Sequence, residues 1–344
     1  MKAVLEFLQS LPVPSRIALT AHQRPDGDAL GSCLGLGWVL RALGHDVTVV
    51  NVSPIPTNLY FLNCDLMEQF HSGYWYSNFD CLGVLDCGDA NRLDEINRSA
   101  LGKLPVFNID HHVSSAGIGD AVWIDASASS VGEMIVRLCQ EAGWQLTLAA
   151  GNALWTSIIT DTGRFSYENT TPAALAAASV CLRAGAAPAE IACNIYQSVA
   201  VEERKLQAKL LGRLELYEQG KMALSWLRRE DFLEAGIGME GAQDLINLIR
   251  DTAGVEVAIF LYESGGDTPD GPSVKISLRT ASPHDALAIA AKYGGGGHMR
   301  AAGCTIAAPL DEVRSQVLST AERLFFHYTG DTVSIRRDDI GGPL

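Results

Sequence analysis

At 344 residues the chain is too long for a single core of ordinary size, which predicts two domains. Its 40 acidic and 26 basic side chains give a formal net charge of −14. A surface this acidic disfavours a protein that tracks long nucleic acids through many Lys and Arg contacts, while small anionic substrates remain compatible with it.

The amino-terminal residues 1–16 read as an amphipathic helix that ends before two prolines, and they lack the pattern of a signal peptide. No window approaches about 18 uninterrupted apolar residues, so we expect no membrane span. The eight cysteines form no C-x-x-C pair and lie mostly in apolar runs, which predicts buried free thiols in a reducing compartment. We therefore expect a cytoplasmic protein.

The first half alternates short β-rich runs with helical patterns. Between the first two runs, residues 29–44 fit a buried crossover helix that ends at Gly44. Apolar strands separated by helices predict an α/β domain with a doubly wound, mostly parallel sheet. Residues 129–200 are mostly helical. The predicted strands are 16–22, 46–52, 81–86, 105–110 and 121–125.

The charged stretch 201–220 changes the pattern and predicts a helical linker. It would join a catalytic domain, residues 1–200, to a smaller α/β domain with a mixed sheet, residues 221–335. In the second domain we expect three strands at 222–227, 255–263 and 273–280. We expect helices at 240–251, 285–293 and 310–328.

The segment AHQRPDGDALGS places His22, Asp26 and Asp28 in one loop directly after a predicted strand. In open α/β sheets, ligands bind at this edge. Ordinary turn chemistry explains Asp, Gly and Pro in such a loop equally well. The loop alone leaves both interpretations open.

Two further strands end in ionisable residues. Asp86 ends an apolar strand in VLDCGDANR, so its carboxylate must reach the sheet edge or be buried with a partner, whereas Asp89 fits a helix cap. In FNIDHHVS, the consecutive residues Asp110, His111 and His112 follow an apolar strand. A lone histidine there would favour a core residue, but this run favours a site that binds a cation or an anionic substrate.

Asp161 follows an apolar helical run in SIITDTGRFSY. A helix C-terminus disfavours an anion, so Asp161 needs a compensating cation unless it is an ordinary solvated loop acid. The four segments together supply five carboxylates and three histidines, more than one metal ion needs. Mixed carboxylate and imidazole ligands favour Mn²⁺, with Mg²⁺ as the alternative. Two ions about 3.5–4 Å apart would bind a phosphoryl group and activate water, which predicts a hydrolase.

The order H-x-x-P-D-G-D-A-x-G-S, D-C-G-D, D-H-H and D-T-G resembles the DHH phosphoesterase superfamily. The later run KISLRT, followed by GGGGHMRAAG, is similar to the DHHA1 domain of that superfamily. Within it, the bifunctional oligoribonuclease and 3′-phosphoadenosine 5′-phosphate (pAp) phosphatase family is the most similar group. The resemblance covers residues 1–330.

This resemblance implies a role for each motif residue of the first half. His112 would face the substrate phosphate, and Asp110 would orient His111 through its other ring nitrogen. Ser115 departs from the pattern, because relatives often have Asn there. The resemblance divides the metal ligands between two ions: His22 and Asp26 for one, Asp28 and His111 for the other, with Asp86 and Asp161 shared.

In the second half, four consecutive glycines at 294–297 would let backbone N–H groups approach an anion closely. A flexible linker is the alternative, but the AAGCTI run that follows reads as packed structure. The resemblance implies that this second set binds the far end of the substrate, while Arg300 fits a solvated surface. The set comprises Arg279, Gly295, Gly296, Gly297 and His298.

The implied activity is hydrolysis of short RNA or DNA oligonucleotides (nanoRNA of about two to five nucleotides) and of pAp, by water activated between two metal ions. The nearest alternative is a phosphodiesterase for cyclic or linear dinucleotides such as c-di-AMP and pApA. The net charge disfavours a processive single-strand exonuclease, and the glycine run, which suits nucleotides better, disfavours a pyrophosphatase. A non-catalytic nucleotide sensor is the remaining alternative. A sensor is disfavoured because every expected ligand position is filled. A homodimer is compatible with the sequence.

Overall fold

The computed structural model describes residues 1–50, 53–62, 64–68, 75–239, 242–265 and 271–326. The chain forms two compact units, Met1–Ser198 and Val199–Leu344. Each unit is built on one six-stranded sheet with its own hydrophobic core. The α/β class predicted from the sequence is confirmed.

The sheet of the first unit is entirely parallel, with the order β3-β2-β1-β4-β5-β6. This is the order of a doubly wound fold, in which the strand order reverses between β1 and β4. Ligands bind at such a switch point, beyond the carboxyl ends of the strands. The strands are β1 (Arg16–Thr20), β2 (Asp46–Val50), β3 (Met67–Glu68), β4 (Cys81–Leu85), β5 (Val106–Asp110) and β6 (Ala121–Ile124).

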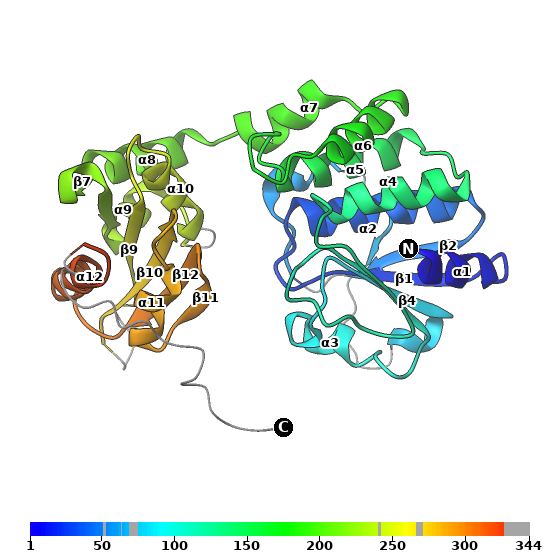
Figure 1. Cartoon of the computed structure of the whole chain (residues 1–344), viewed down its shortest axis with the longest axis horizontal. Helices are drawn as coiled ribbons and strands as arrows, with labels where there is room; N and C mark the ends of the chain where they lie inside the picture. Colours follow the sequence, from blue (N-terminus) through cyan, green and yellow to red (C-terminus); the bar gives the residue numbers. More distant parts are fainter. Residues whose placement is uncertain (51–52, 63, 69–74, 240–241, 266–270, 327–344) are drawn as a thin grey trace, which may run out of the picture. The chain divides into compact units, whose positions relative to one another are not determined.

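Helices cover both faces of this sheet. In Figure 1, α2, α4, α5 and α6 lie on one side and α3 on the other. Side chains of β1 alternate accordingly: Ile17 and Leu19 join the larger core, and Ala18 joins the smaller one. The helices are α1 (Lys2–Ser10), α2 (Gly27–Ala42), α3 (Glu95–Arg98), α4 (Val131–Ala142), α5 (Leu148–Asp161), α6 (Pro172–Arg183) and α7 (Pro188–Ala192).

Helices α2 and α5 pack unusually closely, because α2 presents glycines to its neighbour. A Cβ atom on Gly31 would lie 2.5 Å from the carbonyl oxygen of Ala153, and one on Gly35 would lie 2.4 Å from a methyl group of Leu154. Without side chains at these positions, the two backbones approach each other. This packing brings the first turn of α2 beside the last turns of α5.

The second unit has a mixed sheet with the order β11-β12-β10-β9-β8-β7, in which only β8 and β9 are parallel. The strands are β7 (Glu215–Tyr217), β8 (Met222–Leu227), β9 (Val257–Gly265), β10 (Ser273–Thr280), β11 (Gly296–His298) and β12 (Ala301–Ile306). Helices α11 (Ala286–Ala290) and α12 (Leu310–Phe325) cover one face. The other face packs against α8 (Val201–Gly212), α9 (Arg229–Ala235) and α10 (Ile246–Arg250).

The segment 201–220 is not the continuous helical linker expected. Helix α8 ends at Gly212, and Glu215–Tyr217 forms the edge strand β7. Leu206 and Leu210 are buried in the second unit's core, so two apolar side chains one helical turn apart attach α8 to that unit. The sequence also gave no sign of the two-residue strand β3. Residues 240–241 and 327–328 of the predicted helices lie outside the described part.

Among the described residues, no single helix has the length and apolar composition needed to cross a membrane. The pair Pro172–Arg183 and Pro188–Gln197, bent by 114°, passes that test only when the two are taken together, by length and composition alone.

Candidate active site

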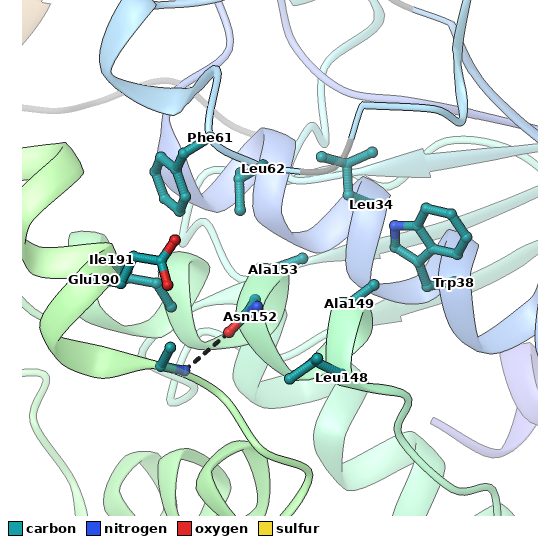
Figure 2. A pocket seen from close by; sticks show the side chains of 11 residues that line it. Leu34, Trp38, Phe61, Leu62, Leu148, Ala149, Asn152, Ala153, Glu190 and Ile191 are labelled. Carbon is teal, nitrogen blue, oxygen red and sulfur yellow. Dashed lines mark hydrogen bonds between the residues drawn. The ribbon is translucent and has the colours of Figure 1, made fainter.

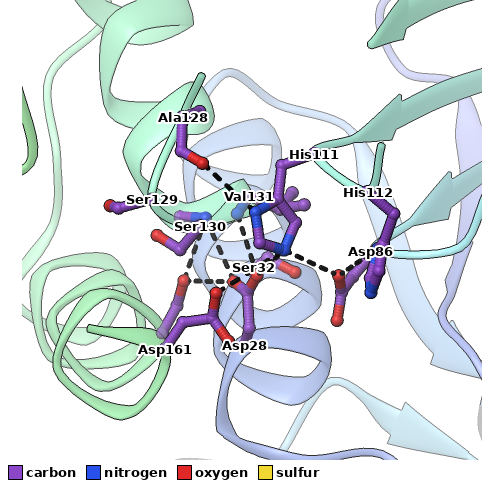
Figure 3. A network of polar contacts seen from close by, with 12 residues as sticks. Asp28, Ser32, Asp86, His111, His112, Ala128, Ser129, Ser130, Val131 and Asp161 are labelled. Atoms are coloured by element: carbon purple, nitrogen blue, oxygen red, sulfur yellow. Dashed lines mark hydrogen bonds and ion pairs between the residues drawn. The ribbon is translucent and has the colours of Figure 1, made fainter. Parts of the chain in front are cut away.

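The ionisable residues of the four motifs gather where β1, β4 and β5 end, next to the switch point of the sheet. Asp86 directly follows β4, and His111 directly follows β5. Asp28 lies in the first turn of α2, and Asp161 is the last residue of α5. Figure 3 shows Asp28, Asp86 and Asp161 around the ring of His111. Segments up to about 130 residues apart in the sequence therefore meet in one site.

The first group of side chains contains His22, Asp26 and Asp86. Nε2 of His22 lies 3.4 Å from Oδ2 of Asp86 and 3.8 Å from Oδ2 of Asp26. The other oxygen of Asp26, Oδ1, caps α2 by accepting the N–H groups of Asp28 and Ala29. Both interpretations of Asp26 are thus compatible, because one oxygen forms the turn and the other faces the site.

The second group contains Asp28, His111 and Asp161. Nε2 of His111 lies 3.6 Å from Oδ2 of Asp28 and 3.6 Å from Oδ2 of Asp161. Nδ1 of His111 lies 3.2 Å from the carbonyl oxygen of Ala128. A ring that donates Nδ1–H to this carbonyl presents Nε2 as a lone-pair ligand. The backbone at Ala128 gave no signal in the sequence.

Asp86 lies between the two groups. Its Oδ1 is 3.6 Å from Nε2 of His111, while its Oδ2 faces His22. The residue is buried, has a left-handed φ of 53°, and its Oδ1 has no hydrogen-bond partner in the described part of the chain. A buried carboxylate oxygen without a donor, on a strained backbone, is typical of a functional site.

The electrostatics of the cluster show a shortage of positive charge. Burial, reinforced by Asp28, raises the pKa of Asp86 well above its usual value. Burial also raises the pKa of Asp28, against the opposing effect of His111, and burial and Asp28 together raise that of Asp161 to about 7. Divalent cations would remove the repulsion among these carboxylates. The donor set of carboxylate oxygens and imidazole nitrogens fits Mn²⁺ or Mg²⁺.

Asp110 orients His112, and the expectation that it orients His111 is wrong. Its Oδ1 lies 2.7 Å from Nδ1 of His112, and it contacts His111 only through the backbone N–H, at 2.9 Å. The reason is that Ala128 already occupies the Nδ1 atom of His111. Although burial opposes it, the hydrogen bond from His112 lowers the pKa of Asp110.

One further expectation and one residue that was not expected lie near these motifs. Asp89 caps the short turn η3 (Ala90–Arg92) by accepting the N–H group of Asn91, as predicted. Sequence reasoning missed Arg92, whose Nη1 lies 3.4 Å from Nε2 of His112. A single exposed arginine in a loop carries no sequence signal, so only the fold could reveal this neighbour.

The second set of predicted residues lies in the second unit. Arg279, in β10, pairs with Ala301 of β12, which pairs in turn with His298 of β11, so the three lie in one row across the sheet. The guanidinium of Arg279 donates to the carbonyl of Leu278. The side chain of His298 lies outside the described part.

Part of the glycine run is a strand: Gly296–His298 form the edge strand β11. A Cβ atom at Gly295 would lie 2.3 Å from the carbonyl oxygen of Gly303, and one at Gly297 would lie 2.5 Å from that of Ala301. Close packing of β11 on β12 therefore explains two of these glycines. Gly296 has open space beside it.

A separate pocket of about 230 Å³ lies between α2, α5 and α7 (Figure 2). Its lining is largely apolar, with Trp38, Phe61 and Leu148 among the larger side chains. Asn152 also lines the pocket, and the Oδ1 atom of its side-chain amide accepts a hydrogen bond from the N–H group of Ala187. No residue of the motifs lines this pocket, so it is distinct from the candidate active site.

A doubly wound sheet with acids and histidines at its switch point defines a class: α/β proteins with a site that can hold metal ions. The model of the DHH family, N-terminal domain, matches residues 16–181, and that of the DHHA1 domain matches residues 220–325. The bifunctional oligoribonuclease and PAP phosphatase NrnA of Thermus thermophilus is 31% identical over 324 residues, covering 92% of each protein. The protein of the same name from Bacillus subtilis is 28% identical over 307 residues, covering 88% of this chain and 92% of the relative.

Solved structures share the fold. An exopolyphosphatase-related protein from Bacteroides fragilis superposes with a TM-score of 0.82 at 22% identity, covering 94% of this chain and 96% of that one. RecJ from Thermus thermophilus, in complex with Mn²⁺, gives a TM-score of 0.51 at 16% identity and covers 93% of this chain and 54% of RecJ. The chain belongs to the DHH phosphoesterase family and is a hydrolase that acts on phosphoester bonds.

Proposed function

We propose that this protein hydrolyses very short oligonucleotides, of about two to five nucleotides, and pAp. The observation that carries the proposal is the gathering of the two groups described above around Asp86, each with its atoms within 4.8 Å of one another. A third group that meets the same limit, Asp86, His111 and His112, shares a residue with each of them. The names of the relatives, oligoribonuclease and PAP phosphatase, support this choice of substrates. The acidic surface supports a short substrate over a long strand.

Two Mn²⁺ ions, with Mg²⁺ as the alternative, would bind the two groups of side chains. His22 and Asp26 would hold one ion, Asp28, His111 and Asp161 the other, and Asp86 both. The contacts of Asp86 with His22 and His111 support its shared position. Asp161 contacts only His111 of the two histidines, so its sharing stays a prediction from the resemblance. When bound, such ions supply an activated water and neutralise phosphoryl charge.

His112 and Asp110 would serve the substrate phosphate. Because Asp110 holds Nδ1 of His112, the ring presents its Nε2 atom away from the carboxylates. Because Nδ1–H is used by Asp110, Nε2 carries a proton only in the imidazolium form of the ring. In that form, Nε2–H could donate to a phosphoryl oxygen as negative charge develops on it. Asp110 is the positioning residue that fixes the ring.

The second unit would bind the remainder of the nucleotide. Arg279 could form a charge-assisted hydrogen bond with a phosphate or base edge, and the backbone at Gly295, Gly296, Gly297 and His298 could contact an anion. The register of β10, β12 and β11 supports a common site for Arg279 and His298.

The domain limits 1–200 and 221–335, a homodimer and a cytoplasmic location stay predictions.

The test is a turnover panel of pAp, pApA, c-di-AMP, a five-nucleotide RNA and a long single strand, each with Mn²⁺ and again after chelation. We expect Mn²⁺-dependent release of product from pAp, pApA and the short RNA, and little from the long strand. Preference for c-di-AMP would favour a dinucleotide phosphodiesterase. Nucleotide binding without any turnover would make the protein a sensor and would contradict the proposal.

A further inference from the structure

The backbone of Arg92 is fixed against the loop that carries the first metal-ligand candidates. Its N–H donates to the carbonyl of Asp89 at 3.0 Å, and its own carbonyl accepts the N–H of Gln23 at 2.8 Å. The side-chain amide of Gln23 also donates to the carbonyl of Leu93, at 2.9 Å. Gln23 is the neighbour of His22, so these contacts fix Arg92 relative to the candidate metal ligands.

The guanidinium of Arg92 is exposed and reaches toward His112, with Nη1 3.4 Å from Nε2. This distance is long for a hydrogen bond, and it involves only one of five N–H donors. Within the described residues, no carboxylate lies within 4.0 Å of this guanidinium. Arg137 and Arg213, by contrast, each form an ion pair. Arg92 thus keeps most of its donors for another partner.

The charges of the site favour an anion as that partner. Four candidate ligand carboxylates, those of Asp26, Asp28, Asp86 and Asp161, would balance two divalent cations. A fifth carboxylate, that of Asp110, is paired with His112. None of the five lies within 4.0 Å of the Arg92 guanidinium, so this cation remains available to an anionic ligand. A phosphoester brings negative charge and several acceptor oxygens, which match the fork of a guanidinium.

We propose that Arg92 is a phosphate-binding residue, which holds a non-bridging oxygen of the reacting phosphoester beside His112. The inference rests on the proposed function, because it assigns a contact to the same substrate phosphate. Arg92 would bind phosphomonoesters and phosphodiesters alike, since it recognises the group they share. It would contribute to the affinity for every substrate of the panel, independently of the base.

Inorganic phosphate is the probe, titrated by calorimetry into the full chain loaded with Mn²⁺. Losing a charge-assisted hydrogen bond should weaken phosphate binding about 30-fold in R92Q. R92K should lie between wild type and R92Q, because an ammonium keeps the charge but lacks the fork. R98Q is the matched control. Arg98 is exposed and lies six residues further along the same segment, and its replacement by Gln removes the same charge. It should bind phosphate as wild type does.

Binding of Mn²⁺ should stay within about twofold of wild type in R92Q, R92K and R98Q, because none of them removes a candidate ligand. Wild-type phosphate affinity in R92Q, equal weakening in R98Q, or no phosphate binding by the wild type would each overturn the assignment. The two proposals fail separately. Phosphate binding that depends on Arg92, in a protein that turns over no member of the panel, would refute the proposed function alone. Turnover that R92Q leaves unchanged would refute the role of Arg92 alone.

Discussion

In the absence of metal, replacing Asp161 by Asn should make the first unit more stable than wild type. In the presence of metal, the same variant should be less stable than wild type. Burial and the neighbouring Asp28 raise the pKa of Asp161 from 3.8 to about 7. Below pH 3.8 the side chain is neutral in both folded and unfolded states, so it adds no penalty. Above about pH 7 the side chain is charged in both states, and the folded state carries the full free-energy cost of the buried negative charge. Metal-free stability should therefore fall as pH rises from about 4 to 7.

The magnitude follows from the same two values. A difference between 3.8 and about 7 corresponds to about 4 kcal/mol. Because the side chain is 31% exposed, solvent screening reduces the effect, and we expect about 2 kcal/mol. Asn carries no charge and avoids the penalty. The metal-free D161N variant should thus be about 2 kcal/mol more stable at pH 8, and less than half of that at pH 5.

Urea unfolding followed by tryptophan fluorescence measures this change. Five of the six tryptophans lie in the first unit, so the signal reports mainly on it. Saturating Mn²⁺ should reverse the order of stability, since a ligand at 100 times its Kd stabilises by about 2.7 kcal/mol and D161N has lost a ligand. D46N, at an exposed position of the same unit, should change stability by less than about 0.5 kcal/mol. A D161N protein that is less stable than wild type in EDTA at pH 8 would refute this reasoning.

Three further variants test the remaining assignments. D86N should lower kcat at least about 1000-fold and abolish tight Mn²⁺ binding, measured by calorimetry, because the side chain lies between both groups; near-normal turnover would contradict the two-ion site. D110N should release the ring of His112 and so lower kcat about 10- to 100-fold, while the affinity for Mn²⁺ changes little. An equal loss of metal affinity would make Asp110 part of the metal site instead. G297A should destabilise the second unit by at least about 1 kcal/mol, since φ is 139° and the added Cβ would meet backbone, whereas G296A should have little effect; thermal unfolding of the two variants compares them.

Much of the first unit could be predicted because its signals are local. Apolar runs fix where each strand ends, and in a parallel sheet these ends share one edge. The acids that follow β1, β4 and β5 therefore had to lie near one another. What the sequence could not supply was the partner of each ring. His111 and His112 are adjacent, and only the three-dimensional course of the chain directs one ring to Ala128 and the other to Asp110.

The errors in the second unit have a similar cause. Helix α8 has a charged surface, and its burial depends on only two leucines, so composition alone suggested a linker. The glycine run carries no side-chain pattern, so its pairing with β12 could not be read from the sequence. Arg92 illustrates the same limit, because its proximity to His112 arises from contacts between two loops.

The packing of α2 on α5 connects the fold to the chemistry. Asp28 accepts hydrogen bonds from Ser157 of α5 and from the backbone N–H of Val131 at the start of α4. It can do so only because Gly31 lets α2 approach within contact of the α5 backbone. The same approach sets Asp28 close enough to Asp161 to raise its pKa. A wider spacing would relieve that repulsion and improve metal-free stability, but it would also separate the two carboxylates that share His111. The close packing therefore favours cation binding at the expense of the metal-free fold.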